Sequence, residues 1–311
     1  MVQVCKGRHA IAWRPLLVEN IQPCYHCTVT KENKLSPLIL ITNDDGIESP
    51  GLRAAAQAAL PLGDVLVVAP NRQWSGAGRS LPHDLQGSIA PYSLRVNGRQ
   101  PPAYQVDGSP AAAVLHGLFE LSSRKPALLI SGINYGENVG ADITISGTVG
   151  AALEGAANGL PALAVSLQTP KETHTRPSED IDFTAAIHFT RFFARRLLEI
   201  KLPFDVDVLK VDVPSSATPE TAWRLTRVSR HTYFTSVPPE RERLAEPARI
   251  DYEPLPHPER TEPDSDIYAL AVDRVISVSP LSHDLTSRVD RGVLEERFLG
   301  LKRHCLPESA C

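Results

Sequence analysis

The feature that most constrains this chain is a short apolar run, residues 38–41, that is followed by two adjacent carboxylates, Asp44 and Asp45. A fully apolar, partly β-branched run of this length is typical of a parallel strand that is covered on both faces. Pro50 and Gly51 then open a segment that favours a helix. In open α/β sheets, ligands bind outside the carboxyl ends of the strands. The two carboxylates are therefore expected in a ligand-binding crevice.

Two explanations are open for these carboxylates. Adjacent ionised carboxylates repel each other, and a bound cation is the simplest way to make the pair favourable, so a divalent metal ion is our first hypothesis. The alternative is that Asn43, Asp44 and Gly46 are only turn and helix-cap residues, because Asn, Asp and Gly dominate such positions. The acidic groups are consecutive, which excludes an EF-hand, and the chain has no Walker A sequence.

Length and composition limit the class of protein. With 311 residues, 42% hydrophobic and 22% charged, the chain is expected to hold one large α/β domain with an appendage. The net charge of −4 argues against a nucleic-acid polymer as partner, because such partners usually require a basic surface. No apolar run approaches the roughly 20 residues of a membrane span, and the N-terminus lacks the apolar region of a signal peptide. We therefore expect a cytoplasmic protein without a membrane partner.

The cysteines do not predict a disulfide framework, because their number is odd and they lie near the two ends. Cys24 and Cys27 have half of a zinc-ligand spacing, which His304 and Cys305 would complete only if the termini meet; incidental cysteines are the alternative. Residues 1–36 show no clear period, and we expect a disordered extension there. The five cysteines are Cys5, Cys24, Cys27, Cys305 and Cys311.

Strand and helix patterns alternate along the chain, which predicts βαβ units and a parallel sheet. An Asn97-Gly98 turn predicts a hairpin between residues 94–96 and 103–106. Residues 238–266, rich in proline and charge, would be a solvated arm or an element held by another subunit. Strands are expected at residues 38–41, 64–69, 127–130, 160–166, 206–213, 223–228 and 267–278, and helices at 52–60, 111–121, 146–157 and 180–200, the last with Phe183, Ile187, Phe192 and Leu197 toward the core.

Further polar residues follow the predicted strand ends. Ser75 comes after the second strand, and a long loop after the third, residues 131–142, contains Asn134 and Asn138. Loops of this length inside compact domains are usually functional. The next helix begins near Ser146, where free backbone N–H groups and hydroxyls would suit a phosphate. The alternative for Ser146 is an ordinary N-cap.

In combination, these motifs resemble the SurE family, the survival-protein-E nucleotidases, over residues 37–288. The resemblance implies a Rossmann-like three-layer α/β sandwich with a mostly parallel sheet and a C-terminal β arm for oligomerisation. Residues 1–36 lie outside the resemblance and are expected to be an N-terminal extension, followed by a catalytic domain (37–230) and an arm (231–311). The motifs that carry it are Asn43-Asp44-Asp45-Gly46 with Pro50-Gly51, Ser75-Gly76-Ala77, Ser131-Gly132-Ile133-Asn134 and Ser146-Gly147-Thr148.

The resemblance implies a metal-dependent 5′-nucleotidase, a phosphoric monoester hydrolase that acts on nucleoside 5′- and 3′-monophosphates. It implies one Mg²⁺ or Mn²⁺ per subunit and a homodimer or homotetramer. Asp44 and Asp45 would be catalytic, and Asp44 would accept a proton from water or attack directly. The metal ligands would be Asp44, Asp45, Ser75 and Asn134, and the phosphate or substrate would contact Asn43, Asn138, Ser146, Gly147 and Thr148.

Two functions are alternatives to the metal-dependent nucleotidase. A haloacid-dehalogenase-like phosphatase needs a second aspartate two residues after the first, where Gly46 stands. A non-catalytic nucleotide- or metal-binding module is the other, and it would retain the ligands without turnover. No histidine lies in a matched motif, so no general acid is visible; His83 and His116 are expected to be ordinary loop and helix residues.

Overall fold

A nine-stranded sheet organises the part of the chain that the computed structural model describes, which is residues 35–83, 87–175 and 178–300. Its central strands are parallel, whereas β3 is antiparallel to β4, and β11 is antiparallel to β7 but parallel to β8; this arrangement confirms the predicted α/β class. The expected N-terminal extension and all five cysteines lie almost wholly outside these residues. In spatial order the strands are β3 (Ile89–Pro91), β4 (Ala103–Val106), β2 (Asp64–Pro70), β1 (Leu38–Thr42), β5 (Leu128–Tyr135), β6 (Ala162–Leu167), β7 (Val208–Val213), β11 (Ile276–Leu281) and β8 (Trp223–Leu225).

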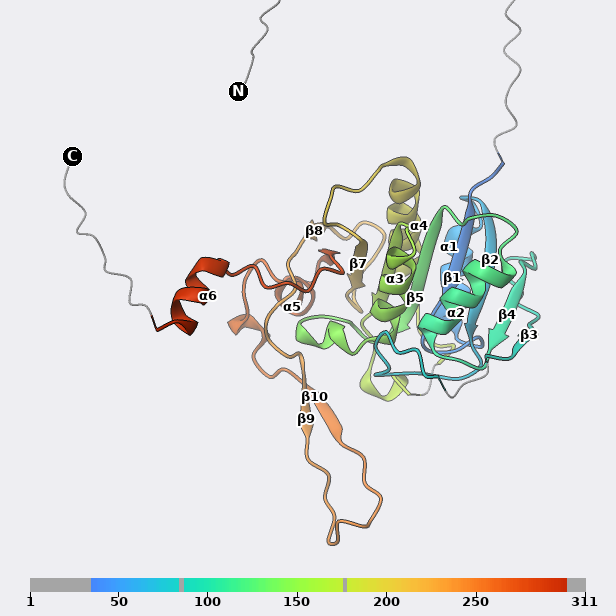
Figure 1. The fold of residues 1–311 in the computed structure, drawn as a ribbon. Helices are drawn as coiled ribbons and strands as arrows, with labels where there is room; N and C mark the ends of the chain where they lie inside the picture. The colour runs from blue at the N-terminus through green and yellow to red at the C-terminus, as the bar shows by residue number, and fades with distance from the viewer. Residues whose placement is uncertain (1–34, 84–86, 176–177, 301–311) are drawn as a thin grey trace, which may run out of the picture. The chain divides into compact units, whose positions relative to one another are not determined.

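Helices cover both faces of the sheet, which gives the predicted three layers (Figure 1). Successive strand residues point to opposite faces, so Ile39 and Ile41 pack toward one core and Leu38 and Leu40 toward the other. The first core contains α1 (Pro50–Ala59) and α4 (Thr184–Glu199), and the second contains α2 (Pro110–His116) and α3 (Gly147–Ala157). No helix among the described residues is long and apolar enough to cross a membrane.

The third predicted strand is longer than the sequence pattern indicates. We expected a loop from residue 131, but β5 continues to Tyr135 and pairs with β6 beyond a register shift between Ser131 and Asn134. The strand continues because of tertiary pairing, which the local sequence does not indicate. Asn134 lies opposite Ser166 and Tyr135 opposite Leu167, so this polar, glycine-containing stretch pairs with β6.

Two other predictions are wrong in part. Asn97 and Gly98 do form a turn with positive φ angles of 49° and 74°, but it closes only a bridge between Val96 and Arg99, while β4 pairs with β2 and β3. Residues 267–278 are not one strand. They begin in helix α5 (Asp266–Ala271), because Ser265 accepts a hydrogen bond from the N–H of Tyr268 as an N-cap.

Helix α4 begins at Thr184 rather than at residue 180. Phe183 and Leu197 are buried as predicted, with exposed fractions of 8% and 3%. Ile187 and Phe192 are only partly buried against the same core. The helix instead buries Phe189, Phe193 and Leu197, which are four residues apart and therefore lie on one face.

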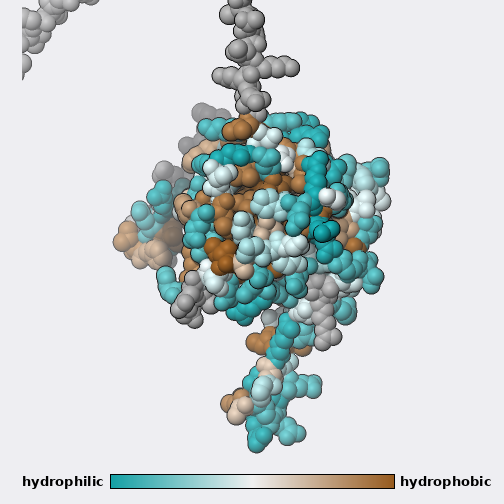
Figure 2. All heavy atoms as spheres, turned by 90° about the vertical axis from the view of Figure 1, so that its right-hand side faces the viewer, coloured by the Kyte–Doolittle hydropathy of each residue, from teal (hydrophilic) through white to brown (hydrophobic). Residues whose placement is uncertain are grey.

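The predicted arm is a two-stranded ribbon of β9 (Phe234–Val237) and β10 (Asp251–Pro254). Figure 1 shows this ribbon and the connection between its strands extending away from the sheet, and Figure 2 shows the arm as mostly hydrophilic. Helix α6 (Arg291–Phe298) follows β11. Short helical turns occur at Gly117–Leu121, Ala141–Thr144, Lys171–Thr173 and Pro258–Arg260.

Candidate functional site

A cavity of about 370 Å³ opens at the carboxyl ends of the parallel strands. Asp44 follows β1, Ser75 follows β2 and Asn134 lies near the end of β5, so the predicted convergence of strand ends is what the fold produces. Residues of the arm complete the wall. The lining residues used below are Asp44, Ser75, Asn134, Glu137, Asn138, Asp142, Ser146, His174, Phe234, Ser236, Arg249, Ile250, Asp251 and Tyr252.

The start of α3 lies directly against Asp44. The hydroxyl of Thr148 donates a hydrogen bond to Asp44 Oδ1 at 2.5 Å. A Cβ on Gly147 would lie 2.7 Å from the Cβ of Asp44, so this position requires glycine. Ser146 accepts a hydrogen bond from the N–H of Val149 and also lines the cavity. The N-cap interpretation of Ser146 therefore holds, and the same residue still borders the site.

Asp45 lies behind the cavity wall rather than on it. Its Oδ1 accepts a hydrogen bond from Gln73 at 3.1 Å, and its Oδ2 accepts one from the N–H of Tyr135 at 3.2 Å. Gln73 also donates to the carbonyl of His174 at 2.6 Å. Each carboxylate oxygen has a second lone pair, so these contacts orient Asp45 and leave it able to bind a cation.

The two carboxylates are buried without a compensating positive charge among the contacts described. Burial raises the pKa of Asp44 to about 6, although hydrogen bonds from Thr148 oppose the rise. Burial also raises the pKa of Asp45 well above its ordinary value, and the nearby charge of Asp44 raises it further. Adjacent carboxyl groups in this environment favour either protonation or a bound cation.

Asn134 and Ser75 provide neutral oxygen atoms at the same cavity. Asn134 Nδ2 donates to the carbonyls of Tyr135 and Gly136 at 3.1 and 2.8 Å, so its Oδ1 is the atom left for a ligand. Ser75 is exposed on the loop after β2. No group of three His, Cys, Asp or Glu side chains clusters as metal ligands in the described ranges. An all-oxygen donor set of two carboxylates, a hydroxyl and an amide suits Mg²⁺ or Mn²⁺ and does not suit zinc.

The two remaining predicted residues differ in position. Asn138 lines the cavity, and its Nδ2 donates to the hydroxyl of Ser166 at 2.8 Å. Asn43 is fully buried and does not reach the cavity wall; its Nδ2 donates to the carbonyl of Gly46 at 3.0 Å. For Asn43, the contacts are those of the turn interpretation.

A buried ionic cluster supports the loop after β5. Lys210 is fully buried on β7, and its Nζ lies 2.5 Å from Asp212 Oδ2 and 3.1 Å from Asp266 Oδ2. Asp212 Oδ1 accepts a hydrogen bond from the backbone N–H of Asn138, and Asp266 Oδ2 accepts one from that of Gly140. The cluster thus fixes the backbone on both sides of residue 139.

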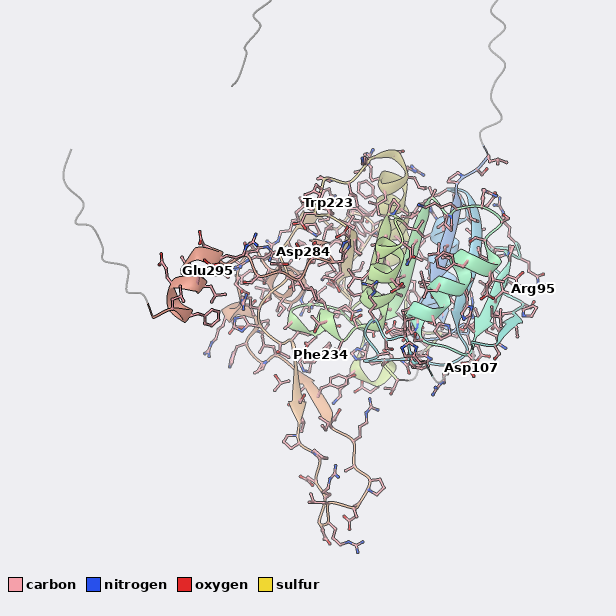
Figure 3. The ribbon with its side chains drawn as sticks, viewed as in Figure 1. Arg95, Asp107, Trp223, Phe234, Asp284 and Glu295 are labelled. Carbon is pink, nitrogen blue, oxygen red and sulfur yellow. The ribbon has the colours of Figure 1, made fainter. Side chains whose placement is uncertain are left out.

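Sequence reasoning missed several residues of the cavity. His174 comes from the segment after β6, Phe234 and Tyr252 come from the arm, and Glu137 is 6% exposed with a pKa raised by burial. Figure 3 shows Phe234 at the base of the arm. The alternation of residues along the ribbon could have predicted the arm residues. Phe234 and Ser236 are two residues apart on β9, and Tyr252 lies opposite Ser236, so all three side chains lie on one face of the ribbon.

The sequence and the fold are similar to those of known proteins. The family model described as "Survival protein SurE" matches residues 39–235. A 5′-nucleotidase SurE of Thermococcus kodakarensis is 41% identical over 261 residues, which is 81% of this chain and 95% of the relative. One from Archaeoglobus fulgidus is 40% identical over 267 residues, 85% of this chain and 98% of the relative. The solved SurE protein from Aquifex aeolicus is 31% identical, with a TM-score of 0.67 over 85% of this chain and all of that chain.

Proposed function

The chain belongs to the survival protein SurE family, and from this premise we propose that it is a divalent-metal-dependent 5′-nucleotidase. It would hydrolyse nucleoside 5′-monophosphates, and also 3′-monophosphates, to a nucleoside and inorganic phosphate. The observation that carries the proposal is the pair of buried carboxylates, Asp44 and Asp45, at a strand-end cavity next to the start of α3. Curated relatives that match most of the chain are named 5′-nucleotidases.

The ligands of the metal ion would be Asp44, Asp45, Ser75 and Asn134, with one Mg²⁺ or Mn²⁺ per subunit. The donor set supports this choice, because all four are hard oxygen donors and two are buried carboxylates with raised pKa values. When bound, the ion would neutralise the carboxylates and supply positive charge to the phosphoryl group. Without that charge, Asp44 on the cavity wall and Asp45 behind it would repel a phosphate.

The residues of the chain would then perform the positioning and the proton transfer. The N-terminus of α3 would hold the phosphate, beside the backbone N–H groups of Gly147 and Thr148 that interact with the Asp44 carboxylate. Asp44 Oδ2 would accept the proton of the attacking water, while its Oδ1 stays fixed by Thr148. The oxygen of the water forms a bond to phosphorus, the bond from phosphorus to the ribose oxygen breaks, and the leaving oxygen takes up a proton.

Phosphate release tests this function. Purified protein is incubated with a panel of 5′- and 3′-mononucleotides in Mg²⁺ or Mn²⁺, and with the same panel in EDTA. We expect release that requires the ion and that is restored when the ion is added back. Folded protein that releases no phosphate with either ion would contradict the proposal and favour a module that binds without turnover.

A further inference from the structure

Three consecutive residues after β2 reach toward the proposed metal site. The side chain of Gln73 donates a hydrogen bond to Asp45 Oδ1 at 3.1 Å. The backbone N–H of Trp74 donates to the carbonyl of Asp44 at 2.7 Å. Ser75, the next residue, lines the cavity together with Asp44. The loop after β2 therefore holds the loop after β1 through a backbone contact and a side-chain contact.

The side-chain amide of Gln73 has two partners. Its Nε2 donates to Asp45 Oδ1 and also to the backbone carbonyl of His174, which lies 2.6 Å away. A primary amide nitrogen carries two hydrogens, so both donors of this group are used. Rotation of the amide would place its oxygen against two acceptors, and only one orientation is therefore favourable. Gln73 thus joins the Asp45 carboxylate to the segment after β6.

That segment also contacts the arm. His174 Nδ1 is hydrogen-bonded to the Tyr252 hydroxyl at 2.8 Å, and the two rings are 12° from parallel with centroids 6.0 Å apart. Lys171 forms an ion pair with Asp251 of the arm, with 2.8 Å between Nζ and Oδ2. The segment that contains Lys171 and His174 is therefore in contact with Gln73 and with β10.

The orientation of Asp45 depends on two hydrogen bonds. One comes from the backbone N–H of Tyr135 on β5, at 3.2 Å, and the other comes from Gln73. The first belongs to a strand in the middle of the sheet, whereas the second depends on where a loop and the segment after β6 lie. Groups that hydrogen-bond to a metal-binding carboxylate fix its orientation, and their loss typically weakens metal binding.

We propose that Gln73 is a positioning residue that orients Asp45 for the metal ion. Through its second hydrogen bond, Gln73 also couples the metal site to the arm, by way of His174 and Tyr252. The inference rests on the proposed metal-dependent function and adds to it a residue that is not itself a ligand. Because coupling between two sites is reciprocal, a bound ion also strengthens the contact between the arm and the rest of the protein.

Manganese binding tests this role without turnover, in a calorimetric titration of the full chain with Mn²⁺ alone. Gln73→Met keeps the length of the side chain and removes both hydrogen bonds, so we expect the Kd for Mn²⁺ to rise about 10- to 100-fold. Tyr252→Phe keeps the ring and removes only the hydroxyl, so we expect a smaller rise, about 2- to 10-fold. In the Gln73→Met background, Tyr252→Phe should add less than about twofold, because the connection is already broken.

Gln100→Met and Tyr104→Phe are the matched controls. Gln100 is exposed, Tyr104 lies on β4, and neither residue lines the strand-end cavity. Both variants should bind Mn²⁺ as tightly as the wild type does. A Kd for Gln73→Met equal to that of the wild type would overturn the positioning role. Effects of Gln73→Met and Tyr252→Phe that simply multiply in the double variant would overturn the coupling to the arm.

Thermal unfolding separates positioning from a general loss of stability. The rise in melting temperature between EDTA and Mn²⁺ reports how tightly the folded protein binds the ion. We expect this rise to be smaller for Gln73→Met than for the wild type. Melting temperatures lowered equally in both buffers would overturn the proposal. If Gln73→Met does not fold, Tyr252→Phe decides the coupling, because it removes a single oxygen atom, and an unchanged Kd for Mn²⁺ in that variant would overturn it.

Manganese affinity also separates this proposal from the nucleotidase function. Wild-type protein that binds Mn²⁺ more tightly than Gln73→Met but releases no phosphate would overturn the function and support the role of Gln73. Wild-type protein that hydrolyses nucleotides while Gln73→Met binds Mn²⁺ equally well would overturn the role of Gln73 alone.

Discussion

Asp44 is placed where its own charge is unfavourable in the absence of a cation. The side chain is 4% exposed, contacts Gly147 and Thr148, and has a pKa of about 6 instead of the ordinary 3.8. In the unfolded chain the group ionises at its ordinary pKa, so folding becomes less favourable as the pH rises from about 4 to above 6. A residue that lowers the free energy of unfolding in this way is typical of a functional site.

Asp44→Asn should therefore stabilise the metal-free protein while abolishing turnover. Asparagine keeps an acceptor for Thr148 and removes the buried charge, and the expected gain at pH 7 is on the order of 1–3 kcal/mol. Thermal unfolding in EDTA measures it, with Glu48→Gln as control, since Glu48 is an exposed carboxylate nearby. A melting temperature at or below that of the wild type would contradict the claim that the buried charge of Asp44 destabilises the metal-free protein.

Strand β7 and helix α5 support the site from a distance through the buried Lys210 and Asp212 of β7 and Asp266 of α5. Removal of the lysine leaves two buried carboxylates without their cation, whereas removal of one carboxylate as well relieves part of that cost. Both elements therefore matter for the loop after β5, because the backbone N–H groups of Asn138 and Gly140 donate to these carboxylates.

Lys210→Met should destabilise the protein by about 3–5 kcal/mol, because it breaks a buried ion pair. The double variant Lys210→Met/Asp212→Asn should recover part of this loss. Urea unfolding of both variants at pH 7 gives the two values. A single variant as stable as the wild type, or a double variant no better than the single one, would show that the cluster does not act as an ionic unit.

The sequence predicts the features of the fold that depend on hydrophobic periodicity and on the order of strands along the chain. Residues 38–41 form an apolar run, and so do residues 64–69 after their first residue. Asp44 and Ser75 follow these two strands, so a parallel sheet brings the two side chains together. It does not predict Lys210 as a buried cation, since the partner Asp266 is 56 residues away. The sequence does not predict His174 and Tyr252 as cavity residues for a related reason. Their position depends on where the arm contacts the rest of the protein, and no local sequence pattern indicates that contact.

Across the whole molecule, the C-terminal segment exposes more apolar side chains than a solvated surface needs. Exposed fractions are 86% for Leu285, 82% for Phe298 and 71% for Leu299. Apolar groups gathered at one end of a chain favour contact with a partner. We propose that a second copy of this chain covers them in a homodimer or homotetramer.

Light scattering coupled to gel filtration tests the assembly. The wild-type protein should have the mass of two or four chains, and Phe298→Glu with Leu299→Glu should lower that mass, because burial of two carboxylates opposes association. A surface substitution outside this segment, Glu48→Gln, should not change the mass. A monomeric wild type would contradict the proposal.

The most direct test of the central claim is the location of the metal ion. Crystals grown or soaked with Mn²⁺ and inorganic phosphate would give an anomalous difference map that places the ion without reference to a mechanism. We predict one peak per chain among Asp44, Asp45, Ser75 and Asn134, with the phosphate at the start of α3. A peak elsewhere in the chain, or no peak at a concentration of Mn²⁺ that supports phosphate release, would contradict the account.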